Sequence, residues 1–119
     1  MAIENAQLTT TQLDLLTVPA SKQYAITTVM VCNKDSSNAA TFDMHLIKSG
    51  EALSNSKTII VKELALPAGE TFTFDSEKIV LGTGDKISFV AEPDTGSGNT
   101  NLVATVSKQY VDVFKTLAT

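Results

Sequence analysis

Apolar and polar residues alternate in short runs along most of this chain. The clearest run covers residues 40–47, in which four apolar residues alternate with three polar ones: Ala40, Phe42, Met44 and Leu46 against Thr41, Asp43 and His45. A period of two places one set on the core face of a β-strand and the other on its opposite face. The pattern therefore predicts a strand whose apolar set is buried and whose polar set, including Asp43 and His45, faces solvent.

The longest run covers residues 24–33 and is apolar on both faces. One face would hold Tyr24, Ile26, Thr28, Met30 and Cys32, and the other Ala25, Thr27, Val29 and Val31. A strand of this kind is either central in its sheet or covered on its second face by another subunit.

Shorter runs of the same type predict the remaining strands, at 13–18, 58–66, 71–74, 79–81, 86–91 and 102–113. No stretch has a 3.6-residue apolar period long enough for a helix of several turns. About eight short antiparallel strands indicate an all-β domain, a β-sandwich of jelly-roll or Greek-key type. We expect a flexible N-terminal arm at 1–12, the sandwich domain at 13–113 and a C-terminal tail at 114–119.

One phrase occurs twice, at Val18–Ile26 and again at Leu66–Phe74. Each copy has an aliphatic residue, Pro-Ala, a small residue, a charged residue and a polar residue, and then an aromatic that begins an alternating run. Proline presets the backbone at the first corner of a turn, and the small residue tolerates the tight bend. Each phrase therefore predicts strand, turn, strand.

Composition narrows the classes of partner. The 119 residues suffice for one domain with its own core, the net charge is −4, and all nine basic residues are lysines. The absence of arginine and of any basic cluster argues against nucleic-acid binding. No signal peptide and no membrane-length apolar run are visible, so we expect a protein that folds in a cytoplasm without a membrane partner. Cys32 is the only cysteine, and we expect a buried, inert thiol.

Four short motifs resemble sites of known chemistry, and each has a simpler interpretation. Asp94-Thr95-Gly96 matches the triplet of retroviral-type aspartic proteases, but Glu-Pro precedes it and Ser-Gly-Asn follows it, which is typical of an exposed loop. Asp43 and His45 have the spacing of two metal ligands on a strand, but the chain has no other histidine. Gly82-Thr83-Gly84 begins like a dinucleotide fingerprint but lacks its third glycine and precedes a strand rather than a helix, so we expect a turn there. Cys32 has no base nearby in the sequence to activate it as a nucleophile. We therefore predict no catalytic, cofactor-binding or metal-binding residues, and a protein that is not an enzyme.

Several apolar residues fall opposite the expected core-facing positions of their strands: Val29, Val31, Ile47, Ile59, Val61 and Val90. If these residues shared an outer face, they would form an association surface larger than a monomer normally exposes. We therefore expect a cyclic homo-oligomer, of which a trimer is one possible form. The alternative is a monomer whose two sheets bury both sets of residues.

The joint order of several phrases resembles that of small virion structural proteins of tailed bacteriophages, especially cyanophages. The matching segments are Val18–Lys22, Val31–Asn33, Ala39–Phe42, Ile60–Lys62, Leu66–Thr71 and Leu81–Ile87. The resemblance implies a β-sandwich located in the virion, assembled in the host cytoplasm, with no catalytic residues. Its leading implication is a capsid decoration (cement) protein whose partners are itself and the major capsid protein. A neck, tail or fibre-associated protein is the alternative. A carbohydrate-binding module for host attachment has less support, because the chain has no tryptophan and only two tyrosines.

Overall fold

Nine strands make up the part of the chain that the computed structural model describes, which comprises residues 2–54, 56–74, 79–92 and 102–111. This part contains no helix, and so none that could cross a bilayer. The strands are β1 (Ala2–Gln7), β2 (Leu13–Thr17), β3 (Gln23–Asn33), β4 (Ala40–Ile47), β5 (Ile59–Leu66), β6 (Thr71–Phe74), β7 (Ile79–Leu81), β8 (Lys86–Ala91) and β9 (Leu102–Val111).

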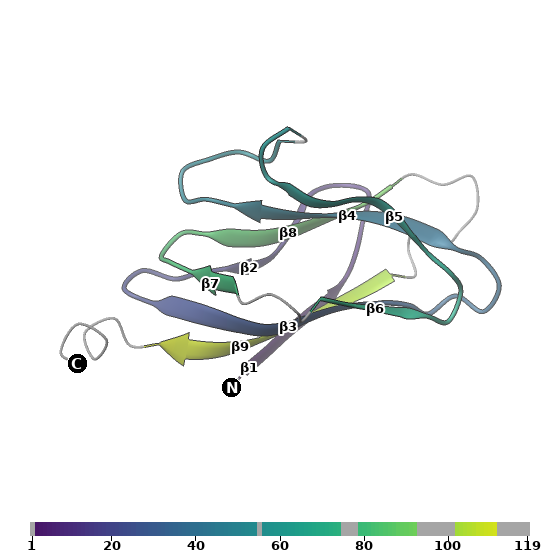
Figure 1. Cartoon of the computed structure of the whole chain (residues 1–119), viewed down its shortest axis with the longest axis horizontal. Helices are drawn as coiled ribbons and strands as arrows, with labels where there is room; N and C mark the ends of the chain where they lie inside the picture. The colour runs from purple at the N-terminus through teal and green to yellow at the C-terminus, as the bar shows by residue number, and fades with distance from the viewer. Residues whose placement is uncertain (1, 55, 75–78, 93–101, 112–119) are drawn as a thin grey trace.

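The strands form two antiparallel sheets packed face to face (Figure 1). The five-stranded sheet has the order β1-β9-β3, with β6 and β7 pairing with different parts of the remaining edge of β3. The four-stranded sheet has the order β2-β8-β4-β5. The pairs are nested, since β1 pairs with β9, β2 with β8, β3 with β6 and β7, and β4 with β5. This nested hairpin, rolled so that β9 meets β3 and β8 meets β4, is a jelly roll, which confirms the predicted fold class.

The core lies between the two sheets and is aliphatic and phenylalanine-based. Phe42 lies at its centre, with ring centroids 5.8 Å from Phe72 and 6.4 Å from Phe89. Val29 and Val106 face it from the five-stranded sheet, and both are fully buried. The two sheets therefore share one hydrophobic core, as a sandwich requires.

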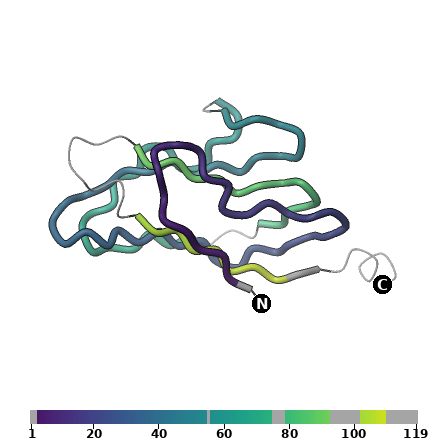
Figure 2. Tube along the Cα trace, turned by 180° about the vertical axis from the view of Figure 1, so that it is seen from behind, coloured from purple at the N-terminus to yellow at the C-terminus, as the bar shows by residue number. Residues whose placement is uncertain are grey.

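The prediction of a flexible arm at residues 1–12 is wrong. Residues 2–7 form β1, which pairs antiparallel with β9, and Figure 2 shows the two segments running side by side. Leu8 then enters the core, and its N–H donates to the carbonyl of Leu102. The alternation was not visible in the sequence because apolar Ile3 lies on the outer face of β1, while charged Glu4 lies on the inner face. On the inner face Glu4 reaches the ammonium group of Lys108.

A β-bulge in β3 corrects the predicted faces of that strand. Its pairing with β9 shifts register between Ile26 and Thr28, so one extra residue reverses the alternation. Tyr24 and Ile26 are buried before the bulge, and Val29 and Val31 are buried after it. Met30 and Cys32, which were expected to share a face with Tyr24 and Ile26, therefore point away from the core.

The same burial removes most of the predicted association surface. Val29, Val31 and Ile47 are buried within the chain. Ile59, Val61 and Val90 are half-buried, and Val61 packs against the core. These six residues do not form a shared exposed patch, so a self-contact would have to use another surface.

The twin phrases form equivalent turns. The N–H of Lys22 donates to the carbonyl of Pro19 (3.3 Å), and the N–H of Glu70 donates to that of Pro67 (3.2 Å). The small residue has a positive φ in both turns, +61° at Ser21 and +76° at Gly69. Because the proline carbonyl accepts the turn hydrogen bond, proline is the first turn residue and the alanine after it forms the first corner, which corrects the expected place of proline. The small residue occupies the third position, where a positive φ defines a type II turn.

We expect an exchange of the small residues between the two turns to have opposite effects. Ser21→Gly should raise the free energy of unfolding by about 0.5 kcal/mol, because glycine adopts a positive φ without steric cost. Gly69→Ser should lower it by about 1 kcal/mol for the converse reason. Urea denaturation followed by circular dichroism measures both. If both variants were shifted in the same direction, the equivalence of the two turns would be disproved.

Candidate functional site

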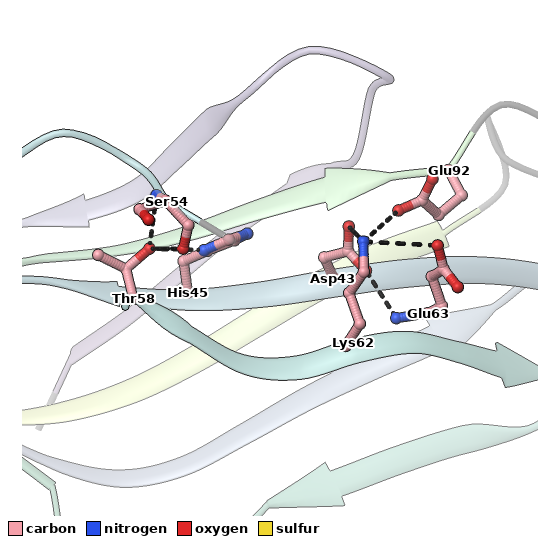
Figure 3. Close-up of polar contacts among 7 residues, drawn as sticks. All are labelled: Asp43, His45, Ser54, Thr58, Lys62, Glu63 and Glu92. Atoms are coloured by element: carbon pink, nitrogen blue, oxygen red, sulfur yellow. Dashed lines mark hydrogen bonds and ion pairs between the residues drawn. The ribbon is translucent and has the colours of Figure 1, made fainter. Parts of the chain in front are cut away.

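Buried polar and charged side chains gather on the outer face of the four-stranded sheet, around β4 and β5 (Figure 3). Asp43 and His45 project from this face of β4, and both are buried, at 4% and 0% exposure. The prediction that these two residues face solvent is therefore wrong. Two local structures cover them, a bulge in β5 and the loop that precedes β5.

Asp43 is buried because it completes the bulge in β5. The pairing of β4 with β5 shifts register between Phe42 and Met44, and Glu63 adopts a positive φ of +49° there. The N–H of Glu63 donates to Asp43 Oδ1 at 2.6 Å, so the carboxylate takes the place of a backbone carbonyl in the ladder. A charge-assisted hydrogen bond of this kind offsets part of the cost of burying the carboxylate.

Lys62 connects three carboxylates beside the bulge. Its Nζ lies 3.7 Å from Asp43 Oδ2, 3.4 Å from Glu63 Oε1 and 3.7 Å from Glu92 Oε1. A hydrogen bond to Asp43, together with burial, raises the pKa of Glu92, and the nearby Lys62 only partly opposes this rise. The cluster therefore joins the middle of β5 to the residue that follows β8, and it favours the protonated form of Glu92.

His45 belongs to a second group, formed with the loop before β5. The Thr58 hydroxyl oxygen accepts the Ser54 N–H (2.9 Å), and it lies 2.9 Å from the Ser54 carbonyl and 2.8 Å from His45 Nδ1. The hydroxyl has one proton for these last two contacts, so the tautomer of the ring decides whether His45 Nδ1 donates or accepts. His45 Nε2 has no hydrogen-bond partner among the described residues.

Burial lowers the pKa of His45. Asp43 on the same strand face opposes this effect, and Lys62 adds to it. The charged ring carries a proton on both nitrogens, and the one on Nε2 would be buried without an acceptor, so the folded state disfavours the charged form. The folded protein consequently binds a proton at His45 less readily than the unfolded chain does.

This difference predicts a loss of stability in mild acid. A pKa lowered by folding leaves the free energy of unfolding unaffected above about pH 6.5, the ordinary histidine value. It reduces that energy as the pH falls further, by at most about 1.4 kcal/mol per pH unit. Denaturation curves collected between pH 7.5 and 5.5 should show this slope, whereas His45→Gln should have lost it.

Glu92→Gln is the matched control for that experiment. The raised pKa of Glu92 has the opposite sign, because its contribution to stability is present at low pH and is lost as the pH rises through the folded value. The variant should keep the His45 slope near pH 6. An unchanged slope in His45→Gln would assign the acid sensitivity to another group.

Ser88 and Asp14 lie beside His45 on the outer face of the four-stranded sheet, but the three residues do not form a catalytic triad. Ser88, directly opposite His45 in the β4–β8 pairing, donates to Asp14 Oδ1 at 2.6 Å. This hydrogen bond is the main cause that lowers the pKa of Asp14, with Gln12 and Lys86 adding to it and burial opposing it. Nucleophilic catalysis by serine needs a histidine that accepts the serine proton, whereas Ser88 gives its proton to Asp14.

The remaining motifs singled out in the sequence have no catalytic geometry among the described residues. Gly82-Thr83-Gly84 begins a turn closed by a hydrogen bond from the Asp85 N–H to the carbonyl of Gly82 (3.1 Å), as predicted. Cys32 is a free, half-buried thiol on the outer face of the five-stranded sheet, which corrects its expected place in the core. Asp94-Thr95-Gly96 and the predicted loop and tail around 92–100 and 114–119 lie outside the described residues, apart from Glu92. Within the described part of the chain, no group of three His, Cys, Asp or Glu side chains is placed to hold a metal ion.

The sequence did not identify most members of the two groups. Lys62, Glu63 and Glu92 come together only through the β5 bulge and the β4–β8 pairing. Thr58 and Ser88 read as ordinary strand residues. The one available signal was the pair Asp43 and His45, whose spacing correctly places both on one strand face.

Comparisons of the chain with protein-family models, with curated proteins and with solved structures found no match.

Proposed function

We propose that this chain is a non-enzymatic structural protein of tailed-bacteriophage particles, a decoration (cement) protein that binds the outer lattice of the capsid. One observation carries the proposal. Three of the six phage-like phrases form the connections β2–β3, β5–β6 and β7–β8, and the other three lie in β3, β4 and β5, so the resemblance follows the scaffold of the fold.

The two Pro-Ala turns illustrate this point. Asn33, from the Val-Cys-Asn phrase, accepts the N–H of Gly69 at 2.9 Å and holds the second turn. Gly84, from the Leu-Gly-Thr-Gly-Asp phrase, donates to the carbonyl of Val18 at 2.9 Å and holds the first turn. Phrases that recur in one order with these linked structural roles support descent from a common scaffold, and jelly rolls are frequent among viral capsid proteins.

The physical properties suit a protein that decorates a capsid. An acidic chain without arginine avoids adhesion to DNA during assembly. Apart from His45 Nε2, the buried polar groups on the outer face of the four-stranded sheet make hydrogen bonds or ion pairs, which suits a rigid scaffold rather than a reactive site. Weak identical contacts repeated over a lattice add up through avidity, so each copy needs only modest affinity.

Particle composition tests the proposal. Particles from the source virus are purified, heads and tails are separated, and the chain is quantified by mass spectrometry in each fraction. We expect it in the head fraction at on the order of hundreds of copies per particle, as a lattice requires. About a dozen copies or fewer in the tail fraction would favour the neck, tail or fibre alternative. Absence from particles would refute both.

Carbohydrate binding remains the alternative from another class, because lectin domains also use jelly rolls. Sugar sites commonly stack the ring on exposed aromatic side chains. Among the described aromatic side chains, Tyr24, Phe42 and Phe89 are buried, and Phe72 and Phe74 are half-buried against the core. A glycan array showing saturable binding would favour the lectin interpretation over the decoration role.

A further inference from the structure

The outer face of the five-stranded sheet has no charged residue in its described part. The pairing registers place these residues on it, opposite the core-facing set: Ile3, Asn5 and Gln7 of β1; Val103, Thr105, Ser107 and Gln109 of β9; Gln23, Ala25, Thr28, Met30 and Cys32 of β3; Thr71 and Thr73 of β6; and Val80 of β7. We call this set the neutral face. The chain as a whole has 9 lysines and 13 acidic residues, so their absence from a four-strand-wide surface sets this face apart.

The other sheet shows the contrast. Its outer face carries Asp14, Lys62 and Lys86 in addition to the buried Asp43. On the neutral face, by comparison, three apolar side chains are exposed: Ile3 is 63% exposed, Val80 62% and Met30 36%. Solvent-exposed sheets ordinarily carry lysine and glutamate, which keep them from associating.

We propose that the neutral face is the surface through which two copies of this chain associate, face to face about a two-fold axis. The contact is isologous, so each residue type must be compatible with itself across the axis. Threonine, serine, asparagine and glutamine both donate and accept hydrogen bonds, so a face made of them can pair with its own copy. A surface evolved for a different protein would be free to carry charges complementary to that partner, and this one carries none.

Electrostatics selects the same surface. Each copy has a net charge of −4, so two copies repel each other in most orientations. The neutral face permits contact without placing like charges opposite one another and without burying an unpaired charge.

The area meets the minimum for a specific dimer. The five strands of the sheet have 34 residues, which at about 4.8 Å per strand and 3.3 Å per residue cover about 540 Å². Two such faces bury about 1,100 Å² in total, which exceeds the value of about 1,000 Å² that a specific interface needs.

The positions of the exposed apolar residues suggest how the two copies are oriented. Ile3 lies on β1 at one edge of the face, and Val80 lies on β7 at the other edge. A two-fold axis parallel to the strands places the β1 edge of one copy over the β7 edge of the other. Ile3 pairs with Ser107 of β9. Val80 pairs with Ala25, and Ala25 pairs with Gln109 of β9. Ile3 of one copy therefore lies within about two residues, measured along the strands, of Val80 of the other copy.

This inference rests on the self-association that is part of the proposed function, but its test is separate. The full-length chain is studied by sedimentation equilibrium over a range of concentrations, together with Met30→Glu at the centre of the face and Thr73→Glu on β6. Thr17→Glu is the matched control, since Thr17 is an exposed threonine on β2 of the other sheet. Circular dichroism melting verifies that each variant is folded.

We expect the wild type and Thr17→Glu to dimerise with similar affinity. Met30→Glu and Thr73→Glu should weaken dimerisation by about 100-fold, because the two-fold axis brings each new carboxylate into the interface twice. A monomeric wild type, a trimer, or a dimer that both face variants leave intact would overturn the proposal. A monomer whose incorporation into particles is abolished by Met30→Glu would assign the face to another virion protein instead. A dimer that is absent from particles would refute the proposed function alone.

Discussion

Replacement of Asn33 by alanine is expected to lower the free energy of unfolding by about 3 kcal/mol. The side chain is fully buried, and its Nδ2 group donates to the carbonyls of Leu66 (2.9 Å) and Asn38 (3.0 Å) while its Oδ1 accepts the Asp35 N–H (3.0 Å). Alanine removes all three hydrogen bonds and leaves the buried Leu66 carbonyl without this donor. Urea denaturation followed by circular dichroism is the measurement, since the chain has no tryptophan.

Two further variants separate the hydrogen bonds from the volume of the side chain. Asn33→Asp has the same shape but turns an oxygen toward the two carbonyls, so we expect it to be at least as destabilising as alanine. Asn38→Ala removes an exposed side chain and retains the backbone carbonyl that Asn33 contacts, so it should cost less than about 0.5 kcal/mol. A mild effect of Asn33→Asp would show that packing, rather than hydrogen bonding, makes Asn33 important.

A second large effect is expected at Gly84, where alanine should cost about 3 kcal/mol. The residue has a φ of +85°, and a Cβ atom there would lie 2.8 Å from Ser49 Cβ and closer still to Ser49 Oγ. The close approach is fixed by two neighbouring hydrogen bonds. The Ser49 N–H donates to Asp85 Oδ1 (2.9 Å), and the Gly84 N–H donates to the carbonyl of Val18 (2.9 Å).

Gly69→Ala provides the control for backbone strain. Gly69 has a similar φ of +76°, but a Cβ there would meet nothing within 4 Å, so the variant should cost only about 1 kcal/mol. Ser49→Gly in the Gly84→Ala background should recover the difference between the two alanine variants, because it removes the clash and leaves the strain. If the double variant were no more stable than Gly84→Ala, the close contact with Ser49 would not be the cause.

The features that the sequence predicted correctly depend on neighbouring residues. The two Pro-Ala turns, the jelly-roll class and the turn at Gly82 follow from proline, small residues and alternation within short segments. The errors involve contacts between distant segments. One inserted residue at the β3 bulge exchanges the faces of Met30 and Val31, and no local signal marks it. Asp43 and His45 appeared solvent-facing because the β5 bulge and the loop at Thr58 cover them only after folding.

The position of β9 has a consequence for how the chain is made. This strand lies between β1 and β3 in the five-stranded sheet, yet it follows the other described strands in the chain. Until β9 leaves the ribosome, β1 has no partner in that sheet and β3 lacks its longest ladder. The nascent chain must therefore protect two unpaired edges while β2 to β8 are synthesised, and the five-stranded sheet closes only when β9 emerges.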